Sequence, residues 1–225
     1  MIPLRDRNPT RKVPVVNIAL IVANIAVYGW SFSHGSGIER IYFQFGVVPS
    51  DVVSAFAEYR YVDAILPFFT SMFLHGGLLH LGGNMLYLWI FGDNIEDKLG
   101  HMRYLWFYVV CGLAAGLTHL GFDPGSDVPT VGASGAISGV LGAYLVLFPR
   151  ARVLTVIPVF FFLQIAELSA IFVLGFWFVI QFLNGLVSLG YGVEGSGGVA
   201  WWAHIGGFVA GVGIILPFRR TLTHG

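Results

Sequence analysis

The chain contains few charged residues. Of its 225 residues, 11% are Asp, Glu, Lys or Arg and 56% are hydrophobic, and the mean hydropathy is +0.77. Soluble domains are closer to a quarter charged, so this composition excludes an ordinary water-soluble fold. Twelve basic residues balance twelve acidic ones. The absence of a basic excess argues against a nucleic-acid partner held by a positive field.

The chain also contains little cysteine and lacks the common metalloprotease motif. Cys111 is the single cysteine, so the chain can form neither an internal disulfide bond nor a cysteine-based metal site. It contains no His-Glu-x-x-His sequence, which excludes a metalloprotease of that type. A pair of catalytic aspartates is excluded too, because Asp93 and Asp97 both lie at one end of the same apolar segment and no other segment contains one.

A histidine-based metal site is a weak alternative. His75, His80 and His204 are histidines that such a site could use. No acidic ligand occurs at a matching depth, and zinc sites usually combine histidine with other ligands. We therefore expect no metal and no cofactor.

Long apolar segments are what the chain has instead. A membrane-spanning helix needs about 20 apolar residues. Six segments suit this role, namely residues 13–33, 74–95, 103–121, 132–149, 168–189 and 198–217. The first is longer than the hydrophobic region of a typical signal peptide, which favours a retained span. With no repeat or domain boundary, the sequence predicts an all-α polytopic membrane protein with one membrane-embedded domain over residues 1–225.

Two further stretches are apolar but do not fit the count of six. Residues 34–73 are too long and too apolar for a plain linker, and we expect short helices lying in the outer membrane interface. Residues 154–166 extend the apolar run that leads into the fifth segment. A seventh span would disturb the charge pattern, so we expect an interfacial or re-entrant approach there.

The basic residues predict an orientation. Ten of the twelve lie before the first segment, after the sixth, or on the connections between segments two and three and between segments four and five. The connections at 122–131 and 190–197 contain none. Because cytoplasmic loops are enriched in Lys and Arg, the pattern predicts six spans with both termini in the cytoplasm.

Two polar residues of the second segment share one helix face. Polar side chains within spans are costly and are often functional. His80 and Asn84 stand four residues apart, so both lie on the same side of a helix. Isolated His and Asn residues also bond neighbouring helices, and this structural role is the simpler interpretation of the pair taken alone.

Ser134 opens the fourth segment, within Gly-Ala-Ser-Gly at 132–135. At a helix N-terminus, unpaired backbone N–H groups and the helix dipole stabilise negative charge. A nucleophile that generates an oxyanion needs such a place. The simpler interpretation is a stripe of small residues, continued at Gly139 and Gly142, that only allows close packing.

His204 lies in the sixth segment beside a second small-residue pair, Gly207 and Gly211. If the glycine faces of the fourth and sixth segments meet, Ser134 and His204 come within hydrogen-bonding distance. A lone histidine bonded to a carbonyl is the simpler interpretation. The joint occurrence of these groups favours a Ser–His dyad, and no carboxylate accompanies the histidine to complete a triad.

Together these motifs resemble those of the rhomboid family of intramembrane serine proteases, in its six-span prokaryotic form. The resemblance extends from the first segment to the sixth. It rests on His75 with His80-x-x-x-Asn84, on Gly-Ala-Ser-Gly at 132–135 and on Ala-His-Ile-Gly-Gly at 203–207. It implies a six-transmembrane-helix bundle in a prokaryotic plasma (inner) membrane, with an active site open to the outer face.

The resemblance also implies roles for single residues. Ser134 would be the nucleophile and His204 the general base. His80, Asn84 and the backbone N–H of Ser134 would stabilise the oxyanion. Supporting positions around the same cavity would be His75, Gly132, Gly135 and Ser138.

Two positions depart from the family pattern. The family often has an aromatic residue one turn after the nucleophile, stacked on the histidine, where this chain has Ser138. The Trp-Arg pair often found in the first loop is replaced by Leu-Pro-Phe-Phe-Thr at 66–70. A different neighbour must therefore orient the His204 imidazole.

The substrate implied by the resemblance is a transmembrane helix of another protein, which enters from the lipid between the second and fifth segments. Helical peptide bonds are shielded by their own hydrogen bonds, so small or helix-breaking residues are expected at the cleavage site. Three aromatic residues of the fifth segment form a hypothetical gate, Phe172, Phe176 and Trp177. Ordinary lipid-facing aromatics are an equally simple interpretation.

Two other functions remain as alternatives. A catalytically inactive rhomboid-like protein would bind transmembrane clients without cutting them. Such relatives lack the serine or the histidine, whereas this chain has both. A small transporter predicts charged residues at the midplane or repeated halves, and the sequence shows neither.

Overall fold

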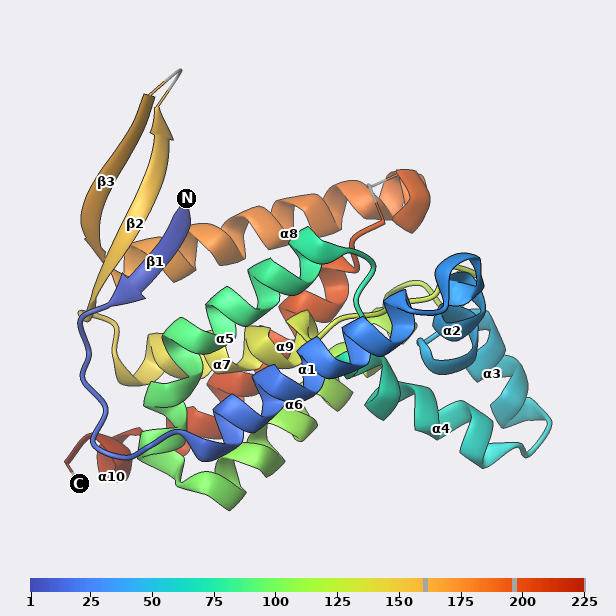
Figure 1. Cartoon of the computed structure of the whole chain (residues 1–225), viewed down its shortest axis with the longest axis horizontal. Coiled ribbons are helices and arrows are strands. Elements are labelled where there is room, and N and C mark those ends of the chain that lie inside the picture. The colour runs from blue at the N-terminus through green and yellow to red at the C-terminus, as the bar shows by residue number, and fades with distance from the viewer. Residues whose placement is uncertain (160–161, 196–197, 225) are drawn as a thin grey trace.

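The structure is a computed structural model that describes residues 1–159, 162–195 and 198–224, and it is mostly helical (Figure 1). Within these residues, six helices form an antiparallel bundle, and each overlaps one of the apolar segments. They are α1 (Val15–Phe32), α5 (Leu78–Leu99), α6 (His101–Phe122), α7 (Ser134–Leu147), α8 (Ala170–Gly195) and α9 (Trp201–Ile215). Both termini lie at the same end of the bundle (Figure 1).

Length and composition support fewer spans than the six expected. Among the described residues, α1, α6, α8 and the run Trp201–Leu222 are long and apolar enough to cross a membrane. A fifth span results if Tyr61–Phe73 and Leu78–Leu99, bent by 80°, count as one. Helix α7 has 14 residues and rises only about 21 Å, less than the roughly 30 Å of a hydrocarbon core. By length and composition, the described residues therefore contain four or five candidate spans.

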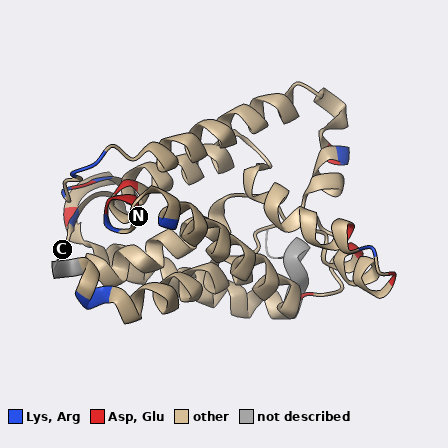
Figure 2. Ribbon diagram, turned by 90° about the horizontal axis from the view of Figure 1, so that it is seen from below, with Lys and Arg blue, Asp and Glu red and all other residues tan. Residues whose placement is uncertain are grey.

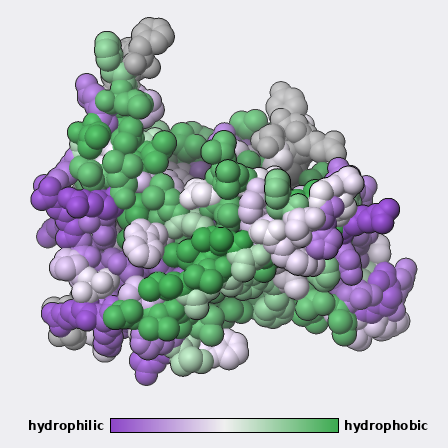
Figure 3. Space-filling view, in the orientation of Figure 1, coloured by the Kyte–Doolittle hydropathy of each residue, from purple (hydrophilic) through white to green (hydrophobic). Residues whose placement is uncertain are grey.

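The surface has the polarity expected of an integral membrane protein. Lys and Arg gather mainly at the end of the bundle where the termini lie (Figure 2). Hydrophilic residues cover the two ends of the molecule, and apolar residues form a band between them (Figure 3). Such a band is what lipid contact requires, because lipid cannot hydrogen-bond exposed polar groups.

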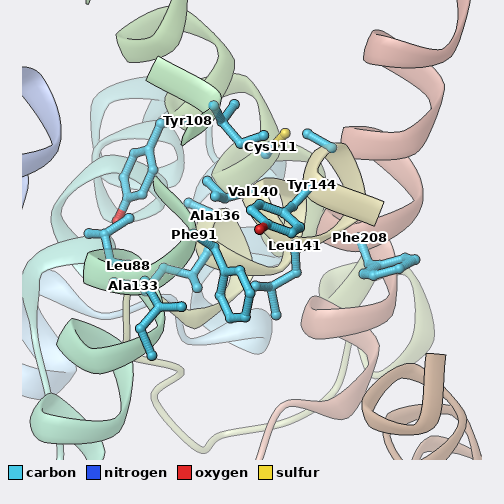
Figure 4. Packing of buried hydrophobic residues seen from close by; sticks show 14 of the residues in the cluster. Leu88, Phe91, Tyr108, Cys111, Ala133, Ala136, Val140, Leu141, Tyr144 and Phe208 are labelled. Carbon is cyan, nitrogen blue, oxygen red and sulfur yellow. The ribbon is translucent and has the colours of Figure 1, made fainter. Parts of the chain in front are cut away.

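Helix α7 lies at the centre of the bundle. Eleven of its fourteen residues are buried, which explains how so short a helix remains apolar all round. Figure 4 shows the core that surrounds it. Side chains of α5, α6 and α9 pack there against Ala136, Val140, Leu141 and Tyr144, and they include Leu88, Phe91, Tyr108, Cys111 and Phe208.

The backbones of α7 and α9 are in direct contact through glycines. A Cβ atom at Gly207 would lie 2.0 Å from the carbonyl oxygen of Gly135. A Cβ atom at Gly211 would lie 2.0 Å from the carbonyl oxygen of Gly139. No side chain fits at these distances, so glycine is required for the approach. The meeting of the two glycine faces considered from the sequence is therefore present.

Three strands correct the all-α expectation. β1 (Ile2–Asp6), β2 (Arg152–Val159) and β3 (Phe162–Ser169) form an antiparallel sheet in the order β1-β2-β3. Of the two expectations for 154–166, the re-entrant approach is wrong, because residues 154–159 and 162–166 belong to two paired strands that point away from the bundle (Figure 1). The interfacial approach stays a prediction. Residues 160–161 lie outside the described residues.

Two features explain the hairpin, namely its β-branched side chains and its pairing with the N-terminal strand. Residues 153–157 are Val-Leu-Thr-Val-Ile, and β-branched residues favour strands over helices. The N-terminal strand then pairs with β2, and Arg7 forms an ion pair with Glu167 of β3. These long-range partners are not visible in a local apolar run.

Short helices fill the first loop, in agreement with the expectation for residues 34–73. They are α2 (Ile38–Phe45), α3 (Pro49–Ala57) and α4 (Tyr61–Thr70), with 3₁₀ turns at Gly35–Gly37 and Ser71–Phe73. The carbonyl oxygen of Ser71 accepts the N–H of Gly132 at 2.9 Å, and Val47 pairs with Thr130. The first loop therefore holds the segment that leads into Ser134. A further 3₁₀ turn, Leu216–Phe218, and α10 (Arg219–His224) follow α9.

Glu96 joins the end of α5 to the start of α1. Its carboxylate is 1% exposed and accepts the backbone N–H groups of Val16 at 2.9 Å and Asn17 at 2.7 Å. The Nδ1 atom of His101 lies 2.5 Å from the same carboxylate. First-turn N–H groups have no partner within their own helix, and they favour negative charge. Glu96 therefore caps α1.

Replacing Gly211 by alanine tests the contact between α7 and α9. The new methyl group would meet the backbone of Gly139, which cannot move aside, so we expect Gly211→Ala to lower the free energy of unfolding by about 1–3 kcal/mol. Gly213→Ala is the matched control, because a Cβ atom there meets nothing within 4 Å. Reversible unfolding in detergent micelles measures both. Equal stability of the two variants would contradict the contact.

Replacing Glu96 by glutamine tests the cap on α1. The amide keeps the size of the side chain but one of its two heteroatoms no longer accepts, so a buried backbone N–H loses its partner. We expect Glu96→Gln to cost about 1–3 kcal/mol of unfolding free energy. Glu39→Gln, at an exposed position of α2, should change it by no more than about 0.5 kcal/mol. A cap of no importance would give two equal values in the same unfolding assay.

Candidate active site

Ser134 and His204 are hydrogen-bonded to each other. Ser134 is the first residue of α7, and His204 lies in the first turn of α9. The Ser134 Oγ atom is 2.8 Å from the His204 Nε2 atom. This distance follows from the glycine contacts between the two helices, which bring their backbones together just beyond these residues. The structure thus brings the two residues together in the geometry of a nucleophile and its base.

The imidazole of His80 lies beside Ser134. Gly132 has φ +135°, a conformation that side chains disfavour. A Cβ atom there would lie 2.8 Å from His80 Nε2 and 3.4 Å from Ser134 Oγ. Glycine at this position therefore serves two needs, the backbone conformation and the close approach of His80 to the loop before α7.

Asn84 follows His80 by about one helical turn and lines the same cavity. It is buried, and within the described part of the chain its Nδ2 atom has no hydrogen-bond partner. Buried polar groups almost always have a partner. An unpaired amide donor in a cavity is therefore available to an oxygen atom of a bound molecule.

His75 packs against His80 but does not line the cavity. Its ring is fully buried and packs against that of His80, with centroids 5.1 Å apart at 69°. The backbone carbonyl of His75 accepts the hydroxyl of Tyr42 at 2.8 Å. His75 is not among the residues that line the cavity. Its position therefore suits packing rather than contact with a ligand.

A cavity of about 980 Å³ contains these groups. It lies between α5, α7 and α9 and is also bordered by residues 128–132 and 198–200. The sequence-predicted residues that line it are His80, Asn84, Gly132, Ser134, Gly135, Ser138, Trp177 and His204. At 980 Å³, the cavity has the size of a site for a peptide segment or an organic ligand.

The N-terminus of α7 offers backbone donors within this cavity. The first helical hydrogen bond of α7 is made by the N–H of Ile137, to the carbonyl of Ala133 at 3.0 Å. The N–H groups of Ser134, Gly135 and Ala136 precede it and have no partner within the helix. They point toward the start of the helix, where negative charge is stabilised.

Gln181 of α8 is a site residue that sequence reasoning missed. Its Oε1 atom lies 2.7 Å from His204 Nδ1, and the side chain is 7% exposed. A signal was present in the sequence, because an uncharged polar residue stands within the apolar segment 168–189. Such residues inside spans default to a functional interpretation. The same argument that selected Asn84 could have selected Gln181.

The three residues of the hypothetical gate differ in position. Trp177 lines the cavity, and its ring centroid lies 6.1 Å from that of His204. Phe172 and Phe176 are 70% and 50% exposed and lie outside the cavity lining. Trp177 is therefore part of the site, whereas the two phenylalanines face outward from the bundle. Their role as a gate stays a prediction.

Ser138 and His119 have other surroundings. The Ser138 hydroxyl donates to the carbonyl oxygen of Ser134 at 2.6 Å. His119 of α6 borders a separate cavity of about 100 Å³. Across the residues that the structure describes, no three His, Cys, Asp or Glu side chains are grouped to hold a metal ion. The site is therefore made of hydroxyl, imidazole and amide groups.

Comparison with curated proteins finds rhomboids. Rhomboid protein 1, mitochondrial, of Saccharomyces cerevisiae is 37% identical over 98 residues, which are 42% of this chain and 28% of that protein. RHOMBOID-like protein 5 of Arabidopsis thaliana is 42% identical over 76 residues, or 34% and 25%. Rhomboid protease GluP of Bacillus subtilis is 33% identical over 153 residues, or 66% and 26%. The chain thus matches about a quarter of the length of each of these relatives.

The family model for the Rhomboid domain matches residues 63–221. This match includes α5 to α9, and with them both residues of the hydrogen-bonded pair and most of the residues that line the cavity. The match covers well over half of the chain. The protein belongs to the rhomboid family.

Proposed function

We propose that this protein is an intramembrane serine endopeptidase that hydrolyses a peptide bond within a transmembrane segment of another protein. The observation that carries the proposal is the 2.8 Å contact between Ser134 Oγ and His204 Nε2 at the wall of a 980 Å³ cavity. A serine hydroxyl is a weak nucleophile unless a base takes its proton. The comparison with Rhomboid protease GluP is in keeping with this chemistry.

The reaction follows from the positions of these groups. Ser134 Oγ attacks the carbonyl carbon of the scissile bond while His204 Nε2 accepts its proton. The imidazolium then gives the proton to the leaving amine, which produces an acyl-enzyme. A water molecule, activated by the same imidazole, hydrolyses the ester and restores the serine. No carboxylate takes part, so the pair acts as a dyad.

Three sources of hydrogen bonds suit the oxyanion. The amide of Asn84 has an unpaired donor, and the N–H groups at the start of α7 have no partner within the helix. His80 lies beside Ser134 across Gly132. Donors fixed in a site with little water stabilise a developing charge without having to reorient.

We further propose an orientation for the enzyme in its membrane. Cytoplasmic loops are enriched in Lys and Arg, and these residues gather at the end where both termini lie (Figure 2). The termini would then be cytoplasmic, and the cavity would open to the outer face of a prokaryotic plasma membrane. Water for the second step would enter from that face.

The substrate would enter from the lipid between α5 and α8. Within this proposal, α8 forms one side of the entrance and carries the residues of the hypothetical gate, Phe172, Phe176 and Trp177. A helical substrate must first expose its peptide bond, so small or helix-breaking residues near the cleavage site are preferred. The partners of this protein are thus other transmembrane proteins.

Loss of either dyad residue should abolish proteolysis. We expect Ser134→Ala and His204→Ala to lower kcat for a single-span reporter in liposomes by at least about 1,000-fold, since residues of such a pair act as a unit. Ser31→Ala, on α1, and His34→Ala, in the turn that follows α1, are matched controls that keep wild-type activity. Cleavage that persists in Ser134→Ala would contradict the proposal. Reporter binding without cleavage by the wild-type protein would instead support the inactive, client-binding alternative.

Asn84 should matter for the rate rather than for binding. Because its amide would contact the oxyanion only once charge develops, we expect Asn84→Ala to lower kcat by about 100- to 1,000-fold with KM little changed. Asn24→Ala is the control, since Asn24 is also buried but bonds the backbone within α1 at 2.8 Å. Steady-state kinetics on the same reporter measure both. A rise in KM at unchanged kcat would assign Asn84 to substrate binding instead.

A further inference from the structure

A side-chain contact joins α8 to the dyad. Gln181 Oε1 and His204 Nδ1 are 2.7 Å apart. We propose that Gln181 is the positioning residue of the dyad, which holds the His204 imidazole in the orientation and tautomer needed to accept the proton of Ser134. This inference rests on the proposed function and names the residue that makes the base competent.

The tautomer follows from the two contacts of the ring. A neutral imidazole has one N–H group and one free lone pair. To accept the proton of Ser134, Nε2 must hold the lone pair, so the N–H must be at Nδ1. That N–H lies against the buried Gln181 side chain, in a part-buried contact, and needs an acceptor. The Gln181 Oε1 atom is in place to accept it.

The reverse arrangement would disable the base. If the Gln181 amide donated to Nδ1, the imidazole proton would have to sit on Nε2. The ring would then donate to Ser134 Oγ and could not take its proton. With Oε1 facing Nδ1 at 2.7 Å, Gln181 accepts there and selects the active tautomer, the role that the carboxylate has in a Ser-His-Asp triad.

Gln181 performs this role without introducing a charge. A carboxylate in the same buried place would be costly to desolvate within a membrane. An amide oxygen accepts one hydrogen bond and remains neutral. This choice fits a chain in which 11% of the residues are charged. Its consequence is a weaker stabilisation of the imidazolium than a carboxylate would give.

The ring is also held from the same helix. Trp177 precedes Gln181 by one turn, so both lie on one face of α8, and its ring lies 6.1 Å from that of His204 at 36°. On α7, the Ser138 hydroxyl is bonded to the carbonyl of Ser134 instead. Ser138 occupies the position at which rhomboids often have an aromatic residue stacked on the histidine. In this chain, residues of α8 contact the imidazole instead.

Two variants and one control test this inference through kinetics. Gln181→Leu removes the acceptor and keeps the bulk of the side chain. Loss of the partner of the His204 N–H should lower kcat by about 10- to 100-fold, with KM unchanged. Ser188→Ala, on the same helix and bonded to Gly185 at 2.8 Å, should keep the wild-type kcat. Wild-type kcat in a folded Gln181→Leu variant would overturn the inference.

The pH profile separates positioning from a structural role. Gln181→Glu places a carboxylate beside Nδ1, which stabilises the protonated ring. Because the dyad needs the unprotonated ring, the acid limb of the kcat profile should move to higher pH by one unit or more, as a nearby charge typically causes. His80 and His119 interact electrostatically with His204, and every variant retains both. An unmoved acid limb in Gln181→Glu, with the new carboxyl group shown to be ionised by its infrared band, would overturn the inference.

A readout that needs no activity separates this inference from the proposed function. In protein labelled with ¹⁵N-histidine, the His204 signals are identified by their loss in His204→Ala. We expect the proton on Nδ1 in the wild type and a mixture of tautomers in Gln181→Leu. A proton on Nε2 in the wild type would overturn the role of Gln181 even in an active protease. Absence of cleavage with the proton on Nδ1 would overturn the proposed function alone.

Discussion

The site depends on one close contact, that of the α7 backbone with the α9 backbone. Gly207 and Gly211 of α9 lie against the carbonyl groups of Gly135 and Gly139 on α7, at distances that leave no room for a Cβ atom. Because van der Waals packing and not the hydrophobic effect drives helix association in lipid, small residues are the means by which membrane helices approach each other. Here the approach has a chemical result, since it fixes the Ser134 hydroxyl on the first residue of one helix against an imidazole of the other.

Scarcity of charge shapes the chemistry of the same site. A buried carboxylate is expensive in a membrane-embedded fold, and the site uses hydroxyl, imidazole, amide and backbone N–H groups instead. Glu96 is the informative exception, because it is buried at the end of α5 but accepts two backbone N–H groups of α1. It lies near the end of the bundle where the termini meet, and it serves the fold. A charged group therefore caps a helix at one end of the bundle, whereas the groups around the cavity are neutral.

Much of the site could be predicted from the sequence, because polar residues are rare in apolar segments and each one stands out. Ser134 and His204 were singled out in this way, and the contact of the two glycine faces, which the sequence offered only as a condition, is present in the structure. The hairpin was missed, since an apolar β-branched run in β2 resembles a membrane segment and its pairing with β1 is long-range. Gln181 could have been selected as a polar residue within an apolar segment, but its contact with His204 could not be predicted, because packing sets the rotation of α8 about its axis. The short length of α7 could not be predicted either, because a helix that is buried by its neighbours does not have to span the bilayer.

The central claim is that the contact of α7 with α9 creates one activated serine. Fluorophosphonate labelling followed by mass spectrometry measures this most directly, because the reagent reacts with a serine only where a base activates its hydroxyl. The account predicts a single modified residue, Ser134, in the membrane-embedded protein, and no modification when His204 is replaced by alanine. Labelling of a different serine, or an undiminished rate at Ser134 without His204, would contradict it.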